Sequence, residues 1–134
     1  MRGFFAFSTM AASALALAGC GPSYPADKQS WTLVGTPFAP PDATIDGRLD
    51  LLPPNDVTEG ARLYDGFQNL QTSQKLNIFW EGSWTGDKEG IELDLSCTDA
   101  FAENVEPPDC ATATLKLSCE VVGEKLDCGD YVFQ

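Results

Sequence analysis

Hydrophobic and polar residues alternate with a period of two through the second half of the chain. In "KLNIFWEGSW", Leu76, Ile78 and Trp80 are separated by Asn77 and Phe79, and the same alternation runs through "GIELDLSC" and "ATLKLSCEVVG". "KLDCGDYVF" follows as a closing strand. Such alternation is typical of antiparallel strands with one buried and one solvent-exposed face. The pattern therefore predicts an antiparallel sheet over residues 75–134.

Two shorter strands are predicted nearer the start of the chain. "WTLVG" covers residues 31–35, and "ATIDGRLDL" covers residues 43–51 with its apolar positions on one face. Seven of the nine prolines lie between Pro22 and Pro54. We therefore expect residues 31–54 to form an extended, Pro-rich part of the same domain.

One segment has a helical period instead. Ala61, Tyr64, Phe67 and Leu70 recur every three residues. Asp56, with Glu59 three residues later, resembles a capping box at a helix start. These residues predict a short helix near residues 57–71. The fold class is thus mainly β: a small antiparallel meander or sandwich with one short helix, stapled by disulfides, in a single domain over residues 31–134.

The first twenty residues have the features of an export signal. Arg2 precedes an uncharged run of about fifteen residues, which is shorter than the roughly twenty that span a bilayer. The run ends in Leu17-Ala18-Gly19-Cys20, which resembles the lipobox of bacterial lipoproteins. The resemblance implies that residues 1–19 are removed, that Cys20 carries lipid, and that residues 20–30 form a lipidated tether to the membrane. Gly21 rather than Asp after the cysteine implies the outer membrane, facing the periplasm.

The cysteine count fits this interpretation. Without Cys20, four of the five cysteines remain, and an even set in an oxidising compartment predicts two disulfides. If Gly123-Glu124 is a two-residue hairpin loop, Cys119 lies opposite Cys128 with their Cα atoms about 4.5 Å apart. Cys97 then pairs with Cys110. A rival pairing, Cys97–Cys119 with Cys110–Cys128, stays open. No Cys-x-x-Cys knuckle is present, so a zinc site is not expected.

Charge and composition narrow the chemistry. The chain has a net charge of −12 and no histidine, and loss of Arg2 with the signal would leave −13. Such a surface disfavours nucleic acid and favours basic partners. Without histidine, Ser-His-Asp and Cys-His catalysis are excluded. The carboxylates follow no calcium-loop spacing. We therefore expect no enzyme activity, no metal and no cofactor.

The aromatic residues give weak binding candidates: Phe79, Trp80 and Trp84. Gly82-x-Trp84 resembles the Gly-x-Trp signature of lipocalin-type barrels, where the motif opens the barrel. Here about fifty residues follow it, which is too few for eight strands. We therefore expect Trp84 to be a core residue beside a tight turn. Phe79 and Trp80 are adjacent, so in a strand one of them must face away from the core.

Together these features predict a lipid-anchored envelope protein without enzymatic activity. The main hypothesis is a binding or inhibitory module that faces a basic protein. Membrane-anchored lysozyme inhibitors are similar in type, because they are small, acidic, β-rich and disulfide-bearing. The alternative is a structural accessory subunit of an outer-membrane complex, docked through residues 31–54.

Overall fold

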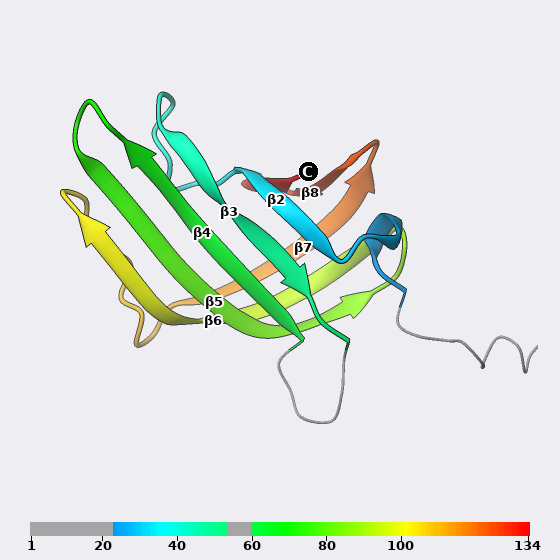
Figure 1. Ribbon diagram of the computed structural model, residues 1–134. Helices are drawn as coiled ribbons and strands as arrows, with labels where there is room; N and C mark the ends of the chain where they lie inside the picture. Colours follow the sequence, from blue (N-terminus) through cyan, green and yellow to red (C-terminus); the bar gives the residue numbers. More distant parts are fainter. Residues whose placement is uncertain (1–22, 54–59) are drawn as a thin grey trace, which may run out of the picture.

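The computed structural model describes residues 23–53 and 60–134, and in them eight antiparallel strands form a closed barrel (Figure 1). Each strand pairs with the next along the chain, and the last pairs back with the first. A 3-10 turn, η1 (Pro25–Asp27), precedes the barrel. The strands are β2 (Ser30–Gly35), β3 (Thr44–Leu51), β4 (Ala61–Asn69), β5 (Gln74–Gly86), β6 (Gly90–Glu103), β7 (Thr114–Val122), β8 (Lys125–Cys128) and β9 (Tyr131–Phe133).

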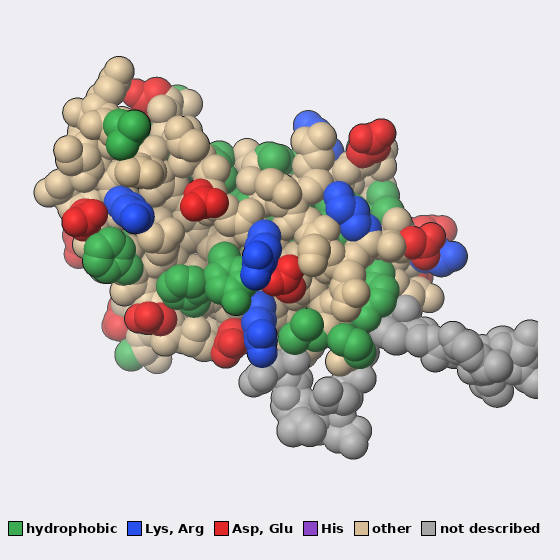
Figure 2. Space-filling model, viewed as in Figure 1, with side chains coloured by type: hydrophobic (Ala, Val, Ile, Leu, Met, Phe, Trp, Pro, Cys, Tyr) green, Lys and Arg blue, Asp and Glu red, His purple; other side chains and the backbone are tan. Residues whose placement is uncertain are grey.

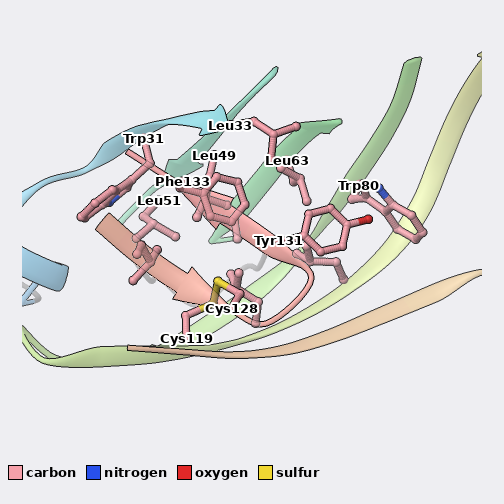
Figure 3. Close-up of a cluster of buried hydrophobic side chains, with 14 of the residues drawn as sticks. Trp31, Leu33, Leu49, Leu51, Leu63, Trp80, Cys119, Cys128, Tyr131 and Phe133 are labelled. Carbon is pink, nitrogen blue, oxygen red and sulfur yellow. A yellow bond between two sulfur atoms is a disulfide. The ribbon is translucent and has the colours of Figure 1, made fainter. Parts of the chain in front are cut away.

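Alternate residues of every strand fill the barrel interior. The period-two pattern of β5, β6 and β7 gives the burial that the sequence predicts, with Leu76, Ile78 and Trp80 inward on β5. Aromatic and branched aliphatic side chains from all eight strands meet in one core. Its most deeply buried large members are Trp31, Phe133, Leu49, Leu51, Leu63, Leu76, Ile78, Leu95 and Leu126 (Figure 3).

The helix expected near residues 57–71 is wrong. Residues 61–69 form strand β4, and the chain then turns through residues 70–73; residues 57–59 lie outside the described residues. The buried positions of β4 alternate, with Ala61, Leu63, Asp65 and Phe67 inward. A carboxylate at one inward position interrupts the apolar alternation, so the strand resembles a helix in sequence.

The sheet closes into a barrel rather than remaining an open meander or a sandwich. The sequence argument against eight strands counted only the residues after Gly82-x-Trp84. Three strands precede that motif, because it lies near the end of β5. Trp84 is nevertheless a core residue, as expected: it is 6% exposed, and its indole Nε1 donates to Leu52 O at 2.9 Å.

The chain's last segment forms two strands, not the single closing strand expected. β8 and β9 are separated by a turn at Gly129, which has a φ of 83°. β9 then joins β2, and Thr32 and Gln134 exchange backbone hydrogen bonds of 2.8 and 2.7 Å. These short strands complete the barrel wall.

Both disulfides have the pairing favoured by the hairpin argument. Cys97 is bonded to Cys110 and Cys119 to Cys128, with Cα–Cα distances of 5.0 and 4.1 Å. The β7–β8 hairpin pairs Val122 with Lys125, as the Gly123-Glu124 loop predicts. Gly123 has a φ of 63°, which its missing Cβ permits.

The segment just before β2, which falls within the predicted tether over residues 20–30, packs on the barrel. The ring of Tyr24 stacks on Trp84 with centroids 5.5 Å apart, and Pro25 is buried. The amide of Ala26 donates to Lys88 O at 3.0 Å. We call this the tether end of the barrel; it also holds the β5–β6 and β7–β8 turns. Cys20 lies outside the described residues.

Three connections lie at the other end of the barrel. They are the β2–β3 loop (residues 36–43), the β4–β5 turn (residues 70–73) and the β6–β7 loop (residues 104–113). The Cys97–Cys110 disulfide ties the last of these loops to β6. We call this the cleft end, for the feature described next.

Candidate ligand-binding cleft

The barrel wall is incomplete beside the first half of β7. β7 pairs with β6 from Thr114 to Glu120, but with β8 only from Glu120 to Val122. The β8–β9 hairpin is too short to reach further along β7. Figure 1 shows β7 continuing past this hairpin toward the cleft end. The wall therefore opens where β7 has only one neighbour.

A cleft of about 620 Å³ occupies this opening. Its lining comes from five parts of the fold: the β2–β3 loop, β5, the β6–β7 loop, β7 and the β8–β9 hairpin. Prolines and apolar side chains predominate, and Phe38 is partly exposed there. The lining residues are Pro37, Phe38, Trp80, Pro108, Ala113, Thr114, Leu115, Lys116, Leu117, Cys128, Gly129, Asp130 and Tyr131. The volume is in the range of small-ligand sites.

Two of these residues carry polar groups that bind a buried carboxylate. Tyr131 donates its hydroxyl to Asp65 Oδ2 at 2.7 Å, and Trp80 donates its indole Nε1 to the same oxygen at 3.3 Å. In Figure 3 the hydroxyl of Tyr131 and the ring nitrogen of Trp80 lie toward each other. Asp65 is only 2% exposed, and its Oδ1 accepts no hydrogen bond within the described part of the chain. The carboxylate thus holds the two aromatic rings in place.

Burial dominates the electrostatics of this group. It raises the pKa of Asp65 above its usual range, and the donors Tyr131 and Trp80 offset the effect only in part. Burial also raises the pKa of Tyr131, and the charge of Asp65 adds to that rise. Because both side chains are buried, they can position Trp80, but they are not exposed to a substrate; of the two, Tyr131 lines the cleft.

The Cys119–Cys128 disulfide marks the inner limit of the opening. Cys119 lies one residue before the first β7–β8 pair, Glu120 with Asp127. Cys128 itself lines the cleft. The bond therefore joins the two walls at the point where their backbone pairing stops.

The surroundings of the cleft are acidic. Asp130 lines it, and Glu106 and Asp109 are exposed on the loop that supplies Pro108. The one cation among its lining residues, Lys116, is 3.6 Å from the carboxylate of Asp94 on the neighbouring strand. Together with the net charge of −12, this arrangement favours a basic ligand.

The three aromatic candidates do not form one site. Trp80 and Trp84 point into the barrel, and only Trp80 reaches the cleft. Phe79 is half-buried on the outer face, where its ring meets that of Tyr64 edge-on at 5.3 Å. Arg48 lies over Tyr64 at 5.1 Å. Basic and hydrophobic side chains lie together in the middle of the face in Figure 2, where β3, β4 and β5 run.

Sequence reasoning missed the cleft, Asp65 and Tyr131. The one available signal was a carboxylate at an inward position of β4, visible only once that segment is recognised as a strand. Within residues 23–53 and 60–134, no three Cys, Asp or Glu side chains are grouped so as to hold a metal. No helix in these residues has the length and apolar character needed to cross a membrane.

Comparison with protein-family models, with curated proteins and with solved structures gives no match for this chain.

Proposed function

We propose that this protein is a lipid-anchored module of the bacterial envelope that binds a basic protein through the cleft. One observation carries the proposal: an apolar cleft with acidic surroundings lies at the barrel end away from the tether. An apolar side chain of the partner would enter the opening, and basic groups around it would face Asp130 and the acidic β6–β7 loop.

The position of the tether supports this assignment. The packed segment at Tyr24 begins only four residues after Cys20, the proposed site of lipid attachment. A four-residue connection spans at most about 14 Å. Lipid at Cys20 would therefore hold the tether end near the membrane and leave the cleft end directed toward the periplasm.

The buried carboxylate supports binding rather than catalysis. Asp65 and Tyr131 are each 2% exposed and use their polar groups on each other. Such a pair gives a rigid floor, and preorganised walls lower the entropic cost of binding. We propose accordingly that the protein acts without enzymatic turnover, cofactor or metal.

The proposal is tested by capture from the native envelope. The lipidated chain, solubilised in detergent, should retain basic proteins at low salt and lose them in about 1 M salt, where the Debye length falls to about 3 Å. Recovery of a membrane complex that resists the salt wash would instead support the structural accessory role. Capture of no protein would contradict both.

Two matched charge variants separate the cleft from general acidity. Glu106→Gln with Asp130→Asn removes two charges at the cleft end, whereas Glu89→Gln with Glu124→Gln removes two at the tether end. The first pair should weaken capture and the second should leave it nearly unchanged. Equal weakening by both pairs would show that net charge, not the cleft, attracts the partner.

A further inference from the structure

The opening beside β7 exposes a strand edge, and the direction of its backbone groups can be read from the β6–β7 pairing. In an antiparallel strand, successive residues point their N–H and C=O groups to opposite neighbours. The carbonyl of Ala113 accepts from Cys97 N at 3.1 Å, and Val121 N donates to Glu89 O at 2.9 Å. The odd-numbered residues of this segment therefore face β6.

The even-numbered residues face the other way. Glu120 and Val122 pair with Asp127 and Lys125 on β8, as this parity requires. Thr114, Lys116 and Ser118 point their N–H and C=O groups to the same side. Within the described residues no strand is paired with them there. The edge from Thr114 to Ser118 is about 13 Å long at 3.3 Å per residue. Thr114 and Lys116 line the cleft, and Ser118 follows them toward the Cys119–Cys128 disulfide.

We propose that the edge of β7 from Thr114 to Ser118 accepts an extended segment of a partner protein as an additional strand. The inference rests on the proposed function and adds its mode of binding. Backbone hydrogen bonds to Thr114, Lys116 and Ser118 give the affinity, as in other cases of strand addition. The added strand completes the wall that the short β8–β9 hairpin leaves open.

The alternation of the added strand defines its sequence class. Leu115 and Leu117 are half-buried and line the cleft, so inward-facing residues of the partner meet an apolar surface with Trp80. Outward-facing residues lie near the acidic β6–β7 loop and Asp130. The occupant is therefore a segment in which apolar and basic residues alternate. A second copy of this chain, with its net charge of −12, would be repelled.

The probe is an eight-residue peptide of alternating Val and Lys with blocked ends. It is titrated into the isotopically labelled full chain in detergent micelles, and backbone amides are followed by NMR. We expect the amide protons of Thr114, Lys116 and Ser118 to shift and to become protected from exchange. The same peptide N-methylated at its central residues keeps the charge but loses its donors, and should bind at least about tenfold more weakly.

A variant of the protein itself provides a second, independent test of strand addition. Ser118→Pro removes an N–H that points into the opening and leaves the β6 side intact, because proline is tolerated at strand edges. Ser118→Ala is the matched control, since it keeps the amide. Peptide binding should be lost in the first and retained in the second. If near-ultraviolet circular dichroism shows that Ser118→Pro does not fold, the inference is tested by comparing how tightly the wild-type chain binds the N-methylated and the unmethylated peptide.

Several results would overturn the inference. They are equal binding of the two peptides, amide shifts confined to residues 98–103 of β6, and no binding at about 1 mM peptide. A chain that forms a dimer disrupted by Ser118→Pro would show that a second copy is the occupant, against the proposal. Capture of basic proteins that is unaffected by Ser118→Pro would refute strand addition and leave the proposed function standing.

Discussion

Replacing Asp65 by Asn should make the protein's stability less dependent on pH. Burial raises the pKa of Asp65 in the folded protein above the unfolded value of about 3.9. Between those two pKa values the folded state binds more protons than the unfolded state. The free energy of unfolding therefore falls as pH rises through this window, and the full penalty is reached above the folded pKa. An amide at this position has no such penalty.

The size of the effect follows from proton linkage. Below about pH 3.9 the Asp65 carboxyl is protonated in both the folded and the unfolded state. The free energies of unfolding of wild type and Asp65→Asn should then differ only by the effect of exchanging a carboxyl for an amide. Above it, the variant should gain up to about 1.4 kcal/mol relative to wild type for each pH unit, until the folded carboxyl ionises. The hydrogen bonds of 2.7 and 3.3 Å to Oδ2 can be kept by the amide oxygen.

Urea unfolding at half-unit steps from pH 3 to pH 7 measures this difference, with both disulfides intact. Other carboxylates titrate equally in both proteins, so the difference isolates Asp65. Glu124→Gln, at the exposed β7–β8 turn, is the matched control and should follow wild type. The free energy of unfolding of Asp65→Asn relative to wild type should rise with pH. If it stays constant or falls, Asp65 is not a buried carboxylate with a raised pKa.

Three further changes test the barrel. Tyr131→Phe removes a 2.7 Å bond to the buried carboxylate and should cost about 1.5–3 kcal/mol at pH 7. Because burial raises the pKa of Tyr131, wild type should lose stability above pH 10, and its free energy of unfolding should approach that of Tyr131→Phe. A difference between the two proteins that stays constant with pH would contradict this. Replacing Cys119 and Cys128 by Ala opens a loop with a sequence separation of 9 and should cost about 2.5 kcal/mol in urea unfolding; no loss would exclude a stabilising role. Gly82→Ala would bring a Cβ into collision with the carbonyl oxygen of Asp94 on the neighbouring strand, and should cost at least about 3 kcal/mol. The control Gly123→Ala has open space but a φ of 63°, and should cost only about 1–2 kcal/mol in the same assay.

The strands could be predicted from sequence wherever one face is uniformly apolar. β3, β5, β6 and β7 have that pattern, and their inward residues are the predicted ones. The disulfide pairing was also predictable, because a two-residue loop at Gly123-Glu124 fixes the register of the hairpin. The strand pattern and the disulfide pairing both follow from residues that are close together in the sequence.

β4 could not be recognised in the same way. Its inward positions include Asp65 and Asn69, which interrupt the apolar alternation. Ala61 and Phe67 then fall at a spacing of three with Tyr64 on the outer face and with Leu70, which is exposed in the following turn. The donors to Asp65 Oδ2 are Trp80 and Tyr131, which are far from it in sequence. A buried polar residue is compatible with a strand only in the presence of such partners, and a local pattern does not contain them.

The cleft exists because β7 is longer than β8. The lengths of both strands are determined by how the strands pair in the barrel. The sequence predicts one closing strand over residues 125–133; it does not show that the strand is divided at Gly129, that β9 joins β2, or that one edge of β7 is left unpaired. Barrel closure is likewise a property of all eight strands together. The binding site was therefore absent from the sequence-based candidates, although Trp80 was among them.

The disulfide at the inner limit of the opening also bears on how the protein matures. Cys119–Cys128 joins the two cleft walls, and such bonds form and persist in oxidising compartments rather than in the cytoplasm. Under the proposed envelope location, a chain still awaiting export would carry both thiols reduced, with the β8–β9 hairpin held to β7 by three residue pairs alone. The cleft would thus acquire its final boundary only after translocation. Newly made protein would therefore become competent to bind only in the compartment where its partner is expected.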